Sequence, residues 1–164
     1  MKKIGILSDT HSYLDENIFR HFEDCDEIWH AGDFGNAAVA EKLASFKPLK
    51  GVYGNIDGYE INSTYPEKQH FTVEQVPVFM QHIGGYPGRY APGVKNEIQL
   101  HGSRLFISGH SHILKVMFDE KLQCLHINPG AAGREGWHKV RTIIRLDIDG
   151  ADMKNCRVIE LGKR

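Results

Sequence analysis

The sequence predicts an α/β protein built from two packed sheets with helices on the outside. In the first third of the chain, short apolar runs alternate with helical periodicity, which is typical of a parallel sheet with right-handed crossovers. The rest is mostly β-rich segments separated by Gly, Pro and Asn, which favours antiparallel pairing. With 164 residues, 41% hydrophobic and 25% charged, the chain has the size and composition of one globular domain spanning residues 1–164.

The first third is expected to follow a strand-helix-strand-helix-strand order. Ile4, Ile6 and Leu7 form a short apolar run that indicates a buried strand. In the next segment, Ile18 and Phe22 fall at helical spacing behind an acidic start. The expected elements are strands at 4–7, 27–31 and 49–53 and helices at 15–22 and 37–46.

The remainder of the chain is expected to form strands with one short helix. Pro77 indicates a sheet edge or a break, and residues 84–93 are dense in Gly and Pro, so they are expected to form a loop. The expected strands cover 71–73, 76–80, 105–108, 114–118, 122–127, 142–148 and 156–161, and the helix covers 96–101.

Composition argues against several classes of function. No apolar run reaches 18 residues, so no membrane span is expected. The formal net charge is −1 and no basic stripe stands out, which argues against a dedicated nucleic-acid surface. The three cysteines lack Cys-x-x-Cys spacing, which favours a reducing, cytoplasmic location. The sequence leaves the oligomeric state open, with a homo-oligomer as one option.

Side chains capable of binding metal directly follow five of the apolar runs. Ligands bind at strand ends in α/β sheets, so these side chains should gather on one rim. Taken singly, Asp33 could cap a helix, Asn55 could sit in a turn and His82 could be an ordinary strand histidine. The joint pattern favours a metal centre, with Asp9 and His11 aimed to one side if strand geometry persists. The candidates are Asp9, His11, Asp33, Asn55, His82, His110 and His112.

The number of candidate ligands suits two ions. Oxygen and imidazole ligands without thiolate are typical of Mn²⁺, Fe²⁺, Zn²⁺, Co²⁺ or Ni²⁺. If Asp33 bridges, it completes two four-ligand sets. Two divalent ions against two carboxylates leave the site positive, which favours a phosphate anion. The first set is Asp9, His11, Asp33 and His112, and the second is Asp33, Asn55, His82 and His110.

These motifs resemble the signature of calcineurin-like metallophosphoesterases. The short length and the turn at 127–130 are similar to the compact YfcE-type phosphodiesterases. The motifs are Asp9-Thr10-His11, Gly32-Asp33, Gly54-Asn55, His82 and Gly109-His110-Ser111-His112. The resemblance implies a four-layer α-β-β-α sandwich and a dinuclear, usually Mn²⁺-preferring, phosphodiesterase or phosphatase. It implies a small phosphate-ester substrate, a metal-bridging hydroxide as nucleophile, and catalytic roles for Asp9, His11, Asp33, Asn55 and His110.

Two positions depart from the family pattern. Ile56 stands where larger members carry a histidine, the expected general acid, so leaving-group protonation is unassigned; His101, Tyr86 and Tyr90 are alternative donors. Ile83 interrupts the usual His-Gly pair, which leaves His70 and His101 as poorer alternatives to His82. Asp57 is expected either to assist the site by orienting a ligand or to cap the Gly58 turn.

Two further expectations concern substrate and function. Arg89 is the only cation in the loop that follows His82, so it either clamps a phosphate together with Asn55 or is a solvated loop residue. A non-catalytic scaffold of the same fold, like the retromer scaffold subunit, is the alternative function, but the complete ligand set favours an enzyme. His30 is expected beneath the site, and His138 on the surface or in packing.

Overall fold

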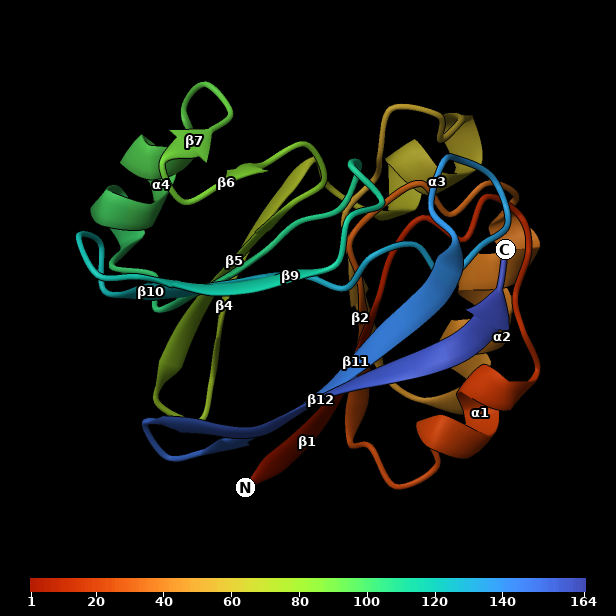
Figure 1. Ribbon diagram of the computed structural model, residues 1–164, viewed down its shortest axis with the longest axis horizontal. Helices are drawn as coiled ribbons and strands as arrows, with labels where there is room; N and C mark the ends of the chain where they lie inside the picture. Colours follow the sequence, from red (N-terminus) through yellow and green to blue (C-terminus); the bar gives the residue numbers. More distant parts are fainter.

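Two five-stranded mixed sheets pack face to face at the centre of the protein. The computed structural model describes residues 1–164, with the first sheet in the right half of Figure 1 and the second in the left half. The first sheet has the order β12-β11-β1-β2-β3 and the second has the order β4-β5-β8-β10-β9. Helices α1, α2 and α3 flank the first sheet and α4 flanks the second, which gives the four-layer sandwich that the resemblance implies.

The first sheet is built from the front of the chain and its last two strands. Strands β1, β2 and β3 are parallel, and β11 lies antiparallel beside β1 and pairs with β12. The expected order of the front third is therefore confirmed, and helix α2 has the predicted bounds. The elements are β1 (Lys2–Leu7), α1 (Asn17–His21), β2 (Glu27–His30), α2 (Ala37–Phe46), β3 (Leu49–Gly51), α3 (Tyr59–Thr64), β11 (Val140–Asp149) and β12 (Asp152–Lys163).

The second sheet is mixed, whereas the sequence favoured antiparallel pairing. Strands β5, β8 and β10 are parallel, and only the edge strands β4 and β9 run antiparallel to them. Parallel pairing becomes available because α4 crosses between β5 and β8. The elements are β4 (Lys68–Val73), β5 (Val76–Gln81), α4 (Val94–His101), β8 (Leu105–Ile107), β9 (Lys115–Asp119) and β10 (Cys124–Asn128).

Two local features were not predicted. Helix α3 lacks an apolar repeat, since Ile61 is its only buried residue. The expected loop at 84–93 contains a two-stranded hairpin, β6 (Gly85–Tyr86) and β7 (Arg89–Tyr90), which lies beside α4 at the upper left of Figure 1. None of the four helices has both the length and the apolar character needed to cross a membrane.

Strand alternation divides the apolar residues among three cores. In β1, Ile6 faces the core between the two sheets, whereas Leu7 faces the core beneath α1 and α2. In β5, Met80 faces the inter-sheet core, whereas Phe79 packs against α4. The central strands of each sheet are therefore buried on both faces, and their ends are free to carry polar chemistry.

A buried ion pair holds the segment before α1 against the end of the first sheet. The Arg141 Nη1 lies 2.7 Å from the Asp15 Oδ2, and both side chains are 9% exposed. The Arg141 guanidinium also donates to the backbone oxygen of Lys163 at 3.0 Å. Burial raises the pKa of the Asp15 carboxyl, but Arg141 outweighs this effect and the pKa is lowered.

Replacing Asp15 by alanine should lower the free energy of unfolding by about 3 kcal/mol at neutral pH, because Arg141 is left buried without its partner. Urea unfolding measures the change, and the difference from wild type should shrink as pH falls through the lowered pKa of Asp15. Lys154→Ala, which removes an exposed pair with Asp149, is the matched control and should change stability little. Equal changes in the two variants would contradict the buried-pair interpretation.

Candidate metal centre

The seven candidate ligands meet at one rim of the sandwich. Each follows the carboxyl end of a strand in the parallel part of its sheet, where ligands of α/β proteins bind. The side chains come from the segments after β1 (Asp9, His11), β2 (Asp33), β3 (Asn55), β5 (His82) and β8 (His110, His112).

The two carboxylates lie among three imidazoles. The Asp9 Oδ1 is 3.1 Å from the His112 Nε2, 3.7 Å from the His11 Nε2 and 3.8 Å from the His82 Nε2. The Asp33 Oδ2 is 3.2 Å from the His82 Nε2 and 3.4 Å from the His11 Nε2. These atoms therefore form one continuous cluster of oxygen and nitrogen ligands.

The remaining two ligands meet at His82. The Asn55 Oδ1 lies 3.1 Å from the His82 Nε2 and 2.9 Å from the His110 Nδ1. The His82 Nδ1 donates to the backbone oxygen of Ala31 at 2.6 Å, which fixes the tautomer and leaves the Nε2 lone pair facing the cluster. The structure thus brings His82 to the other ligands despite Ile83, and it places His70 and His101 elsewhere.

Each carboxylate uses one oxygen for support and turns the other toward the cluster. The Asp9 Oδ2 accepts from the Ser8 hydroxyl at 2.6 Å and from the His110 backbone N–H at 3.1 Å. The Asp33 Oδ1 accepts from the Ile56 backbone N–H at 3.0 Å. The Asp9 Oδ1 and the His11 Nε2 are buried and have no hydrogen-bond partner. Two buried, unsatisfied polar atoms that face each other fit a cation between them.

Backbone conformation, rather than strand alternation, aims the ligands. Five of the seven lie in the left-handed region, with φ between 44° and 72°: Asp9, His11, Asp33, His110 and His112. Asp9 and His11 come together, but not through persisting strand geometry, since both follow the end of β1 in left-handed backbone. Asp and His tolerate this region better than most residues, but each such position still costs on the order of 1 kcal/mol.

Glycine precedes several ligands because the backbone approaches the carboxylates closely. A Cβ at Gly54 would lie 2.5 Å from the Asp33 backbone nitrogen, and a Cβ at Gly109 would lie 2.7 Å from the Asp9 Oδ2. Any side chain at either position would displace a carboxylate. The Gly-Asn and Gly-His pairs of the sequence therefore have a steric origin.

Asp57 braces the loops that carry the ligands. Its Oδ2 accepts from the backbone N–H groups of Asp33 at 3.0 Å and Gly54 at 2.8 Å, and its Oδ1 accepts from Gly35 at 2.9 Å. All three bonds are to backbone, and Asp57 is 8% exposed. Of its two predicted roles, this geometry supports orienting a ligand, and it gives Asp57 no contact with a reacting group.

A buried histidine supports the centre from below. The His30 ring stacks on Phe34 at 3.7 Å, accepts from the Gly32 N–H at 3.1 Å and lies 3.0 Å from the Thr10 hydroxyl. Burial lowers the pKa of His30 to about 3, so the ring is neutral. A neutral ring placed here holds the segments after β1 and β2 without adding charge to the centre.

Charge in the cluster is strongly coupled. Interaction with Asp33 and Asp9 raises the pKa of His11 to about 10. Burial raises the pKa values of Asp9 and Asp33, but the neighbouring imidazoles outweigh burial and both are lowered. Burial lowers the pKa of His82, but Asp33 and Asp9 again outweigh it. Without an ion the cluster therefore holds protons, which a metal would displace.

The ligands fall into two overlapping groups, each able to surround an ion. One contains Asp9, His11 and His112, and the other contains Asp9, Asp33 and His82, with the ligand atoms of each within 4.8 Å of one another. Asp9 is common to both groups, whereas the sequence prediction made Asp33 the shared ligand. The Asp33 Oδ2 also reaches a histidine of each group, namely His11 and His82.

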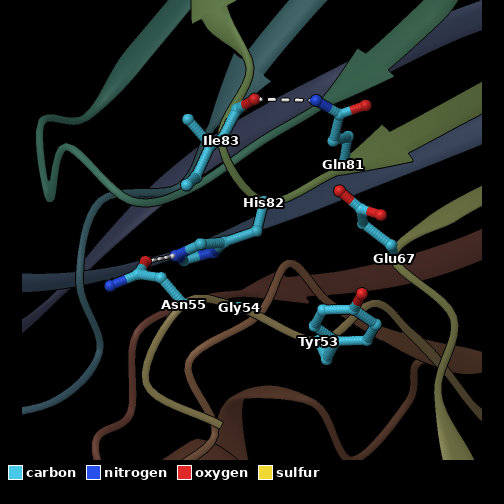
Figure 2. Close-up of a pocket in the computed structure, with 7 residues that line it drawn as sticks. All are labelled: Tyr53, Gly54, Asn55, Glu67, Gln81, His82 and Ile83. Carbon is cyan, nitrogen blue, oxygen red and sulfur yellow. Dashed lines mark hydrogen bonds between the residues drawn. The ribbon is translucent and has the colours of Figure 1, made fainter. Parts of the chain in front are cut away.

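A small pocket opens beside the second group. Figure 2 shows Asn55 against the His82 ring, with Tyr53 and Glu67 across the pocket and Ile83 at its rim. The pocket gives a ligand access to Asn55 and His82 from solvent.

Several predicted contributors lie away from this centre. Arg89, in β7, lines a separate hollow together with Lys95 and Lys121, and none of its ten lining residues is a predicted metal ligand. The structure therefore gives no support to the predicted phosphate clamp, because the hairpin folds toward α4. The Tyr90 hydroxyl donates to Asp119 at 2.6 Å and His101 pairs with Glu97, so neither is placed as a proton donor.

Sequence reasoning missed one histidine at the centre. The rings of His138 and His112 meet edge to face at 5.2 Å, and the His138 Nε2 donates to the backbone oxygen of Gly133 at 2.8 Å. No strand precedes His138, and its position depends on the turn before it, so the sequence carried no signal for this contact.

Comparison with known proteins identifies similar domains. The family model described as "Calcineurin-like phosphoesterase superfamily domain" matches residues 1–151. A probable metallophosphoesterase of Methanothermobacter thermautotrophicus is 30% identical over 133 residues, covering 78% of this chain and 76% of that protein. A solved archaeal phosphodiesterase matches with a TM-score of 0.76 and 24% identity over 97% of this chain and 99% of its own. Vps29 of Chaetomium thermophilum matches with a TM-score of 0.78 and 18% identity over 100% of both chains. The two structural matches show a shared fold.

Proposed function

Because the chain belongs to the calcineurin-like phosphoesterase superfamily, we propose that it is a phosphodiesterase that binds two divalent metal ions at this centre. The observation that carries the proposal is the convergence of two buried carboxylates with unsatisfied imidazole and carboxylate atoms at one rim. Oxygen and imidazole ligands without thiolate suit Mn²⁺, with Zn²⁺, Fe²⁺, Co²⁺ and Ni²⁺ as alternatives. Bound ions supply an activated water and neutralise the phosphoryl oxygens.

The side chains of the chain would divide the work of holding the ions. One ion would be held by Asp9, His11 and His112. The other would be held by Asn55, His82 and His110, and Asp33 would contact both. Ser8 and the His110 backbone N–H keep the Asp9 carboxylate turned toward the cluster. Asn55 lines the pocket, where its amide would also reach a phosphate oxygen of a bound ester. Catalytic roles are proposed for the ligands, and a positioning role for Asp57.

The proposal is tested with aryl phosphodiesters and matched monoesters after removal of metal by a chelator. We expect hydrolysis to be lost in the metal-free protein and restored by Mn²⁺, with diesters preferred. Absence of hydrolysis of either class with any of the five ions, in protein shown to be folded, would overturn the proposal. It would favour the alternative, a non-catalytic binding protein, for which the exposed apolar side chains of edge strand β9 offer a surface: Val116, Met117 and Phe118.

Replacing Asp57 by asparagine should lower kcat/KM by about 10–100-fold, the usual effect of losing a partner that orients metal ligands. An amide cannot accept all three backbone hydrogen bonds, so at least one of the loops at Asp33, Gly35 and Gly54 should lose its fixed position. Because the ligands remain, excess Mn²⁺ should partly restore activity, which a directly reacting residue would not allow. Asp26→Asn, which changes an exposed aspartate bonded to the Lys3 backbone N–H, is the control and should keep full activity. Loss of activity that excess Mn²⁺ leaves unchanged would contradict the positioning role.

A further inference from the structure

A second cluster of metal-binding side chains lies on the outer face of the second sheet, away from the rim. It consists of His70 on β4 and of Glu97 and His101 on α4, whose ligand atoms all lie within 4.8 Å of one another. We propose that these three side chains bind a single divalent ion of the zinc class, independently of the centre described above. The fourth position faces solvent, since the His101 side chain is 44% exposed.

The distances suit a tetrahedral ion. The Glu97 Oε2 lies 2.8 Å from the His70 Nε2 and 3.5 Å from the His101 Nε2. Zinc bonds of about 2.0–2.1 Å place neighbouring ligand atoms of a tetrahedron about 3.3–3.4 Å apart. The Glu97–His101 distance already matches, and the Glu97–His70 contact needs to open by about half an ångström. The exposed His101 ring must also turn out of its stack on His70, so that both Nε2 lone pairs point at the ion. Two histidines and one glutamate form a recognised zinc ligand set with an open position.

The surroundings hold His70 and Glu97 in place and leave the exposed His101 ring room to turn. Glu97 and His101 are four residues apart on α4, so they share one face of the helix. The His70 ring is sandwiched between Phe79, at 4.5 Å, and His101, at 3.6 Å. The His70 Nδ1 has no hydrogen-bond partner, so the Glu97 carboxylate is the only polar contact of this ring.

The ion pair with Lys68 engages one oxygen of the Glu97 carboxylate and leaves the other oxygen for the ion. Lys68 lies 3.4 Å from the Glu97 Oε1, on the side away from the imidazoles. The Oε2 is therefore the oxygen that both histidines approach. An ion here would tie α4 to β4, the edge strand of the sheet, which contributes no residue to the small core around Phe79.

The test is the number of zinc ions per chain at fixed free zinc. Full-length wild type, Glu97→Gln and His101→Ala are dialysed against zinc buffered by a chelator, and bound zinc is counted by mass spectrometry. Both variants should bind one fewer ion than wild type, because losing one of three ligands should weaken binding by more than the ~10–100-fold typical of a supporting partner. Zinc should also raise the melting temperature of wild type more than that of either variant.

Two controls distinguish loss of this zinc site from damage to the metal centre at the rim and from the effect of removing any one histidine. His21→Ala removes an unrelated histidine at the end of α1 and should keep the wild-type zinc count. Mn²⁺-dependent hydrolysis should be unchanged in Glu97→Gln and His101→Ala, since both lie on the outer face. Circular dichroism in chelator checks that the variants are folded. Equal zinc content in wild type, Glu97→Gln and His101→Ala at every free zinc concentration would show a hydrogen-bonded cluster only and overturn the proposal.

Discussion

Asp33→Asn should reduce phosphodiester hydrolysis to the level of chelator-treated wild type. The substitution removes one of the two carboxylates of the ligand cluster and can turn an amide N–H₂ toward the imidazoles of His11 and His82, which now lie 3.4 Å and 3.2 Å from the carboxylate. If Asp33 contacts both ions, neither group of ligands keeps its affinity. The loss should exceed the ~10–100-fold expected for a positioning residue such as Asp57.

Metal content provides the decisive measurement for Asp33. After dialysis, Asp33→Asn should retain neither ion, whereas His112→Ala, which alters one group only, should retain one. Arg89→Ala lies in a separate hollow and should retain both ions and full activity, which makes it the control for surface substitutions. Two tightly held ions in Asp33→Asn would remove the proposed bridging role and direct attention to Asp9, which belongs to both groups.

The second large effect follows from Ile56. General-acid catalysis is typically worth about 10²–10⁴-fold, and an isoleucine cannot supply it. Ile56 is 46% exposed and donates its backbone N–H to Asp33, so this position lies next to the centre. With Tyr90 bonded to Asp119 and His101 bonded to Glu97, two alternative donors are engaged elsewhere. We therefore expect kcat/KM to fall steeply as leaving-group pKa rises across an aryl phosphodiester series.

Ile56→His should flatten this dependence, because it places an imidazole beside the departing oxygen. The largest gain, toward the ~10²–10⁴-fold range, is expected for esters with poor leaving groups, and little gain for those with good ones. Ile83→His is the matched control, since Ile83 is similarly exposed and lines the pocket next to His82. A shallow slope in wild type, with chemistry shown to be rate-limiting, would rule out the missing-acid account and leave Tyr86 and His138 as the donors to examine.

The elements of the fold with strong local patterns were predictable. The apolar repeat of α2 fixed both of its ends, and the short apolar runs located the central strands. Parallel pairing of β5, β8 and β10 was not predictable, because a strand's partner is decided by the crossovers and not by its own residues. Strand β12 begins four residues before the predicted start, because its polar residues lie on an exposed ribbon where alternation is weak.

At the metal centre, the positions of the candidate ligands directly after the predicted strands indicated which side chains would lie together. That these side chains bind metal stays a prediction. How they meet was beyond the sequence, since five of them depend on left-handed backbone in loops. The brace by Asp57 and the contact of His138 with His112 likewise depend on tertiary structure. Closeness in sequence did not place Arg89, because it follows His82 by only seven residues, yet it lines a separate hollow beside α4, and its role stays a prediction.

The left-handed backbone that aims the candidate ligands lowers the stability of the fold. Each holds a non-glycine residue in a sparsely populated conformation, and Asp9 and Asp33 are also buried charges. Replacing such a residue by glycine would relax the backbone, so a metal-free chain can become more stable as it loses its ligands. Where the ions are scarce, loss of such a ligand should therefore carry no cost in stability. A sandwich of this kind can therefore drift from catalysis toward pure binding without passing through a poorly folded intermediate, and selection for the reaction must act continuously to prevent it.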